Sequence, residues 1–353
     1  MTIPVTIHED TPARYCETRH VPIGVVAAIA PWNYPLLLAA FKLGPALVTG
    51  NCVVLKPSPF TPLTSLKLGE LVQTILPPGV LNVISGGDAL GPWLTEHPGI
   101  DKIAFTGSTA TGKRVMASAA ETLKRLTLEL GGNDPAIVMH DVDPVALAPK
   151  LFWAAFGNAG QVCLATKRLY VHAAVYDHVR DALRDYAMGV RVGSGQAPDT
   201  QIGPINNRAH FLCLVKLIED CKTNGYRFAC GGTVPTGPGY FLPPSIIDNP
   251  PEAARIVQDE QFNPILPMMA FADYDDAMRR ANSGPYGLAR PSGPATRRRA
   301  TRWRSETWLT TCGSTNVAPS RLWCLSQDTD NPDSAWKTAS RACLSTRSRA
   351  RPA

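Results

Sequence analysis

The chain has 353 residues, of which 44% are apolar, so it can bury a large core, and its length favours two or three domains over one. No apolar run approaches the roughly 18 residues of a membrane-spanning helix, and the N-terminus lacks the basic and apolar regions of a secretory signal. We therefore expect a cytoplasmic protein without membrane association, and the nine cysteines, an odd number without zinc-site spacing, exclude a disulfide framework.

The formal charge of +6 belongs to one end of the chain. Residues 290–353 hold 12 Lys and Arg against 4 Asp and Glu, whereas residues 1–289 hold 23 against 25. A basic tail can bind polyanions without a fold, but no groove-reading motif accompanies this one. The sequence therefore predicts no specific nucleic-acid partner.

Residues 21–130 alternate short β-branched runs with helical stretches, a pattern typical of a parallel sheet with crossover helices. We predict an α/β fold, with a doubly wound, Rossmann-like dinucleotide-binding domain whose ligand lies at the carboxyl ends of the strands. Residues 1–20 are expected to form an extended arm outside this domain. The predicted strands are 24–30, 52–56, 80–84, 102–106 and 126–130.

Residues 131–289 predict a second α/β domain, which would carry the catalytic thiol. The expected elements are a helix at 144–156, a strand at 168–172 and helices at 176–186 and 209–224. Beyond Leu288 the periodic pattern stops, and residues 290–353 are rich in Ser, Thr, Arg and Trp. We expect this aberrant basic tail to be disordered.

Cys163 lies in a turn of small residues, Gly-Asn-Ala-Gly-Gln-Val-Cys, between the helix that ends near Phe156 and the next strand. A nucleophilic thiol needs a loop that exposes it and backbone N–H groups that favour its thiolate. Most lone cysteines are inert small hydrophobes, which is the alternative for this one. The pattern makes Cys163 the candidate nucleophile.

Two glycine-rich turns join strands to helices in residues 21–130. Gly107 and Ser108 open the predicted helix 109–120, whose N-terminal N–H groups and dipole suit a pyrophosphate. Gly87 and Gly91 lie in a similar turn. Glycines alone are a weak signal, because every tight turn uses them.

Six motifs in this order resemble the aldehyde dehydrogenase superfamily, and the resemblance covers about residues 12–288. The Gly-Gln-Val-Cys segment matches the active-site motif of that family. The motifs are Pro31-Trp-Asn-Tyr-Pro, Lys56-Pro-Ser, Phe105-Thr-Gly-Ser, Leu128-Glu-Leu-Gly-Gly-Asn-Asp-Pro, Gly160-Gln-Val-Cys and Glu260-Gln-Phe-Asn-Pro.

The resemblance implies an NAD(P)-dependent aldehyde dehydrogenase that oxidises an aldehyde to a carboxylic acid. Cys163 would form a thiohemiacetal and then a thioester, and its oxyanion would be held by the Asn33 amide and the Cys163 N–H. Glu129 would activate the hydrolytic water, which needs a carboxylate whose pKa is raised in a partly desolvated site. Taken alone, Asn33 could equally be a turn residue and Glu129 a solvent-facing charge.

The resemblance also implies the cofactor contacts. Lys56 would contact the adenosine ribose and Glu260 the nicotinamide ribose, with Phe262 packing beside it. Pro59 stands where many NAD-preferring relatives have a glutamate that repels a 2′-phosphate, so NADP stays open, although NAD is favoured. The implied cofactor-binding set is Trp32, Lys56, Ser58, Gly87, Gly91, Gly107, Ser108, Glu260 and Phe262. No metal ligand set is predicted.

The chain departs from the family at both ends. Relatives carry a longer segment before Pro31, and in a shifted reading frame the tail can encode sequence like their C-terminus, so we expect a truncated chain with a frameshifted tail. Family members homo-oligomerise through arms that would be missing or altered here. The alternative function is a catalytically inactive remnant that retains at most dinucleotide binding.

Overall fold

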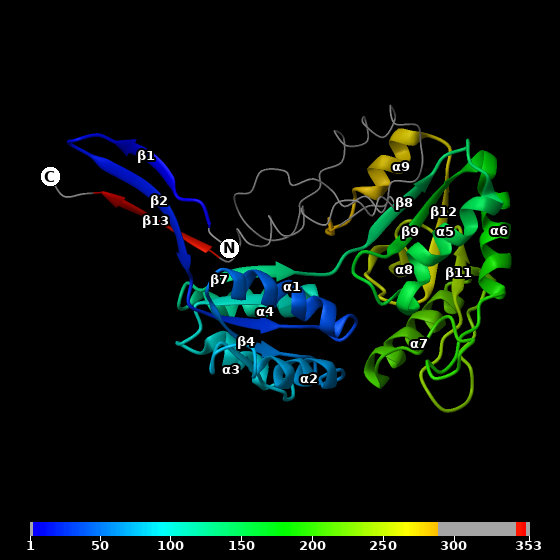
Figure 1. Ribbon diagram of the computed structural model, residues 1–353. Helices are drawn as coiled ribbons and strands as arrows, with labels where there is room; N and C mark the ends of the chain where they lie inside the picture. Colours follow the sequence, from blue (N-terminus) through cyan, green and yellow to red (C-terminus); the bar gives the residue numbers. More distant parts are fainter. Residues whose placement is uncertain (1–2, 289–343, 351–353) are drawn as a thin grey trace. The chain divides into compact units, whose positions relative to one another are not determined.

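The computed structural model describes residues 3–288 and 344–350, and the chain divides into two units between Leu130 and Gly131. The first unit is built on a parallel five-stranded sheet in the order β5-β4-β3-β6-β7. Figure 1 shows two of these strands, β4 and β7, together with the helices α1 to α4 of this unit. Its strands are β3 (Val25–Ile29), β4 (Cys52–Lys56), β5 (Leu81–Val83), β6 (Lys102–Thr106) and β7 (Arg125–Glu129), and its helices are α1 (Pro35–Val48), α2 (Leu63–Val72), α3 (Leu90–Glu96) and α4 (Thr109–Ala120).

Strand β3 shows why helices cover both faces of this sheet. Successive side chains of a strand point to opposite faces, and every residue from Val26 to Ala30 is buried. Val26 and Ala28 pack in a core with residues of α1 and α2, whereas Ala27 and Ile29 pack with residues of α3 and α4. A strand buried on both faces is a continuous apolar run, which confirms the predicted doubly wound fold.

A separate antiparallel sheet pairs β1 (Thr6–Asp10) with β2 (Tyr15–Pro22), and β2 with β13 (Leu344–Ala350). The expectation of a wholly disordered tail is wrong for residues 344–350. The backbone of β2 offers a second row of hydrogen-bonding groups, and residues 344–350 contain neither Pro nor Gly to prevent pairing. The rest of the predicted tail, apart from these residues, lies outside the described part of the chain.

The second unit contains a mixed five-stranded sheet in the order β10-β11-β12-β9-β8, in which only β10 pairs antiparallel. Its strands are β8 (Asp134–Val138), β9 (Thr166–His172), β10 (Arg227–Cys230), β11 (Ser245–Asp248) and β12 (Ile265–Phe271). Its helices are α5 (Pro144–Phe156), α6 (Tyr176–Met188), α7 (Arg208–Thr223), α8 (Arg255–Gln258) and α9 (Tyr274–Ala281), with short 3-10 turns η1 (Gly157–Gly160) and η2 (Ala173–Val175).

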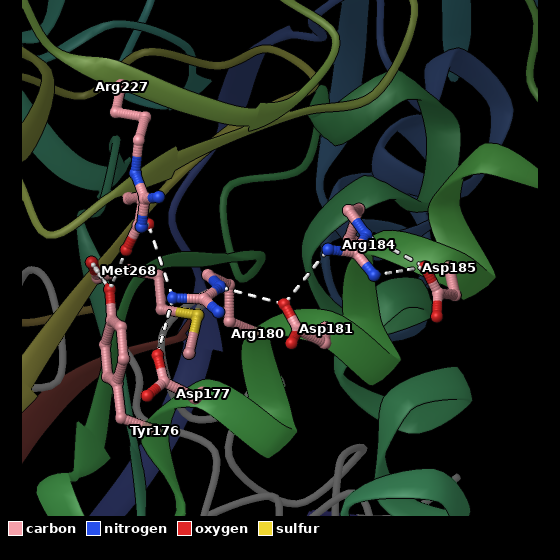
Figure 2. A network of polar contacts seen from close by, with 9 residues as sticks. Tyr176, Asp177, Arg180, Asp181, Arg184, Asp185, Arg227 and Met268 are labelled. Carbon is pink, nitrogen blue, oxygen red and sulfur yellow. Dashed lines mark hydrogen bonds and ion pairs between the residues drawn. The ribbon is translucent and has the colours of Figure 1, made fainter.

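A polar network joins α6 to the sheet of this unit (Figure 2). The Asp248 carboxylate, at the end of β11, has a side chain that is only 3% exposed. It accepts a hydrogen bond from the Tyr176 hydroxyl at 2.7 Å and pairs with Arg180 and Arg227. Because a buried carboxylate is costly without such partners, this network fixes α6 on the sheet.

Several predicted elements have the observed bounds, among them the helices 109–120 and 144–156 and the strands 52–56 and 102–106. Differences are confined to one or two residues at element ends, where β9 begins at Thr166 instead of residue 168. Terminal residues contribute few hydrogen bonds to an element, so its ends are set by local caps that the apolar pattern does not encode.

Candidate active site

The carboxyl ends of the five parallel strands lie at one edge of the sheet in the first unit. The chain order runs outward from β3 to β4 and β5, and then returns to β6 and β7 on the other side of β3. This reversal between β3 and β6 is the topological switch point where doubly wound sheets bind ligands. Asn33, Lys56, Gly107 and Glu129 lie at or just after these strand ends.

Glu129 is the last residue of β7, beside Thr106 of β6, and is an exposed residue. Protein atoms around the carboxyl group nevertheless raise its pKa by desolvation, and the charge of Lys42 opposes that rise. A raised pKa is what a carboxylate general base requires near neutral pH.

Lys42 is a residue of this site that the sequence interpretation missed. It lies inside α1, only 8% exposed, and its ammonium donates to the Thr106 hydroxyl and to the Leu38 carbonyl at 3.4 Å. Burial lowers its pKa to about 8, while Glu129 acts in the opposite direction. A lysine in an otherwise apolar helix is the signal that could have identified it.

Lys56 is the last residue of β4 and Ser58 lies two residues further on, and both are buried, at 6% and 7% exposure. The Lys56 ammonium donates to the Pro57 carbonyl at 3.4 Å, and burial lowers its pKa while Asp88 opposes that effect. Trp32 and Asn33 are half-buried in the turn between β3 and α1. These side chains are donors of the kind that bind ribose and carbonyl oxygens.

The two glycine turns differ in what they require. A Cβ on Gly107 would lie 2.5 Å from the Phe105 ring, so a side chain here would require that buried ring to shift. Ser108 caps α4 by accepting a hydrogen bond from the Thr111 N–H at 3.2 Å. A Cβ on Gly87 or Gly91 would have no heavy atom within 4 Å. The close contact at Gly107 therefore favours glycine at that position, whereas Gly87 and Gly91 have room for a side chain.

The second unit places Cys163 in a loop between η1 and β9. Three consecutive residues before it, Asn158, Ala159 and Gly160, have φ values of 53°, 55° and 69°. A non-glycine residue in this left-handed region costs of the order of 1 kcal/mol, so the surrounding structure must impose it. Buried Gln161 does so, because it donates to the Asn158 carbonyl at 3.0 Å and accepts from the Asn206 N–H at 2.9 Å.

The segment 260–264 packs against residues 157–165, which carry Cys163 and are here called the thiol loop. A Cβ on Gly160 would lie 2.0 Å from the Asn263 carbonyl oxygen, so only glycine permits the approach. Phe262 itself has a φ of 53°, and its carbonyl accepts a hydrogen bond from His210 at 2.8 Å. Cys163, Glu260 and Phe262, far apart in the sequence, therefore belong to two loops that are in contact within one unit.

Glu260 is anchored by the turn after β7. The Gly132 N–H donates to its carboxylate at 3.1 Å, and a Cβ on Gly131 would overlap that carboxylate, so the glycine pair makes room for it. Burial raises the pKa of Glu260, and Lys167 opposes this rise.

Two other kinds of site are not found among the described residues. Within residues 3–288, no group of three or more His, Cys, Asp and Glu side chains is arranged to hold a metal ion. In the same part of the chain, no helix is both long and apolar enough to cross a bilayer.

A doubly wound parallel sheet in one unit and a constrained cysteine loop in the other define a two-unit α/β protein with a thiol site. The chain belongs to the aldehyde dehydrogenase family, whose sequence profile matches residues 2–317. It is 49% identical over 271 residues to an aldehyde dehydrogenase of Fusarium sp., a match covering 76% of this chain and 56% of the relative. The chain thus spans little more than half the length of the curated relatives it matches.

Solved structures give the same family. The NAD+ complex of an aldehyde dehydrogenase from Bacillus cereus superposes with a TM-score of 0.90 at 30% identity, covering 99% of this chain and 72% of that one. An NADP-dependent enzyme of E. coli superposes with a TM-score of 0.87 at 31% identity, covering 99% of this chain and 74% of that one.

Proposed function

We propose that this chain carries the aldehyde-oxidising chemistry of its family, with Cys163 as nucleophile, Glu129 as general base and Asn33 as oxyanion donor. The overall reaction converts an aldehyde, an oxidised nicotinamide cofactor and water into a carboxylate, the reduced cofactor and two protons. The observation that carries the proposal is the strained thiol loop, because three left-handed residues held by Gln161 present one cysteine beside the segment 260–264.

The first step is attack of the Cys163 thiolate on the aldehyde carbon, which forms a C–S bond and leaves the charge on oxygen. The Asn33 amide and the Cys163 N–H are the proposed donors to that oxyanion. A bound nicotinamide would supply a hydride acceptor for the same carbon, and Cys163 would then hold the acyl group as a thioester.

The second step is hydrolysis of the thioester. Glu129 removes one proton from water as the water attacks, and the C–S bond breaks to release Cys163 as a thiolate. The carboxylic acid product loses the second proton to solvent and leaves as a carboxylate. Desolvation raises the pKa of Glu129, which strengthens it as a base, and the charge of Lys42 opposes that rise.

The donor set fits a dinucleotide cofactor. Lys56 and Ser58 provide donors for ribose hydroxyls, the N-terminus of α4 at Gly107 and Ser108 suits a pyrophosphate, and Glu260 provides an acceptor for a second ribose. We propose NAD as cofactor, with NADP as the alternative that Pro59 leaves open. The two relatives above were solved as an NAD+ complex and as an NADP-dependent enzyme.

The proposal is tested by following absorbance at 340 nm with NAD or NADP and a panel of aliphatic and aromatic aldehydes. Cys163→Ala should abolish turnover, while Cys213→Ala, which alters an exposed cysteine of α7, should leave it unchanged. Folded protein that binds the cofactor without any turnover would instead identify an inactive remnant.

A further inference from the structure

Lys167 is a buried lysine that contacts the thiol loop. It is the second residue of β9, four positions after Cys163, and only 3% of it is exposed. Its ammonium donates to the Val162 carbonyl at 2.6 Å, so it holds the peptide group next to the proposed nucleophile. An ammonium this well buried is unusual, since lysines almost always keep their charge in water.

The surroundings of Lys167 come from three further segments of the same unit. Its ammonium lies 5.1 Å from the centroid of the Phe262 ring, in a cation–π arrangement. Three anionic or ionisable groups face it: Asp134 on β8, Glu260 before Phe262, and the Cys163 thiol. Burial lowers the pKa of Lys167, and all three of these groups oppose that effect.

Resting on the function proposed above, we infer that Lys167 is a positioning residue that favours the thiolate of Cys163 and ties the thiol loop to the segment 260–262. The Lys167 ammonium holds the carbonyl of the residue before Cys163, and the Cys163 thiol is among the groups that interact with it electrostatically. Glu260 and Asp134 favour the charged form of the lysine, against the effect of its burial. The coupling is reciprocal, because each charge of such a pair stabilises the other.

Replacement of the lysine by two neutral side chains separates its charge from its hydrogen bond. Lys167→Gln removes the charge but keeps a donor for the Val162 carbonyl, whereas Lys167→Met removes both. Lys150→Met, which alters an exposed lysine of α5, is the matched control. Circular dichroism and thermal melting establish that each full-length variant is folded.

The readout is the rate of iodoacetamide labelling at Cys163, measured from pH 5 to 10 by peptide mass spectrometry without substrate or cofactor. An opposite charge that interacts electrostatically with a thiol shifts such a titration by about one pH unit. We expect the midpoint of the labelling curve to rise by about one unit in both Lys167 variants, with about tenfold slower labelling at pH 7, and no change in Lys150→Met.

Labelling curves for Lys167→Gln that coincide with those of the unaltered chain would overturn the inference and leave only a structural hydrogen bond. Lys167→Arg, which restores the charge, should return the midpoint toward that of the unaltered chain. Because labelling needs no turnover, the inference is judged separately from the proposed function, which fails if Cys163→Ala retains activity.

Discussion

Lys42→Met should stabilise the folded chain at neutral pH, and the gain should vanish at high pH. In the unfolded chain Lys42 keeps its proton up to its ordinary pKa of 10.5, whereas burial lowers that pKa to about 8 in the folded state. Below pH 8 both states hold the proton, and the buried charge costs the fold about 3 kcal/mol, from 1.36 kcal/mol per pKa unit.

The cost of the buried charge decreases between pH 8 and 10.5, because there the unfolded chain binds more protons than the folded one. Methionine has similar length and no charge. Subtracting about 1 kcal/mol for the lost hydrogen bond to Thr106 leaves an expected gain of about 2 kcal/mol at pH 7. The ionised fraction of Glu129, the proposed base, should fall at any given pH in the same variant, because the pKa of Glu129 rises further without the Lys42 charge.

Urea unfolding at pH 7 and pH 10.5 measures the stability, with Lys113→Met, an exposed lysine of α4, as control. The acid limb of the turnover profile should also move to higher pH in Lys42→Met. Equal stability differences at the two pH values, or a variant less stable at pH 7, would refute the assignment of a charge cost to Lys42.

Two further substitutions probe the second unit. Gly160→Ala should destabilise this unit by at least about 2 kcal/mol in thermal melting, because the φ of Gly160 is 69° and the added methyl group would overlap the Asn263 carbonyl. The same change should slow labelling of Cys163. Gly157→Ala is the control, because the space around Gly157 is open. Asp248→Asn should cost about 2 kcal/mol in urea unfolding, since the buried carboxylate loses its charged pairing with the half-buried Arg180 and the exposed Arg227. A loss no larger than that of Asp185→Asn, on the exposed side of α6, would contradict this.

The sequence alone determined the elements of the fold and the order of the motifs. Short, β-branched apolar runs such as Val25–Ile29 are typical of strands buried on both faces, and the helical stretches between them supply the crossovers, so the pattern predicts the doubly wound sheet. The Gly-Gln-Val-Cys segment likewise marks a turn that exposes a thiol. These features depend on neighbouring residues, which a linear pattern records.

Tertiary structure alone decided which distant residues share an environment. The buried positions of Lys42 and Lys167, the contact of Gly160 with Asn263, and the pairing of residues 344–350 with β2 all join segments far apart in the chain. The periodicity of apolar residues predicts which face of a helix or strand is buried. The pKa of a lysine depends instead on the solvent that folding removes from it and on the charges that folding brings near it. The sequence therefore determined the candidate nucleophile and base, and packing decided which cations lie beside them.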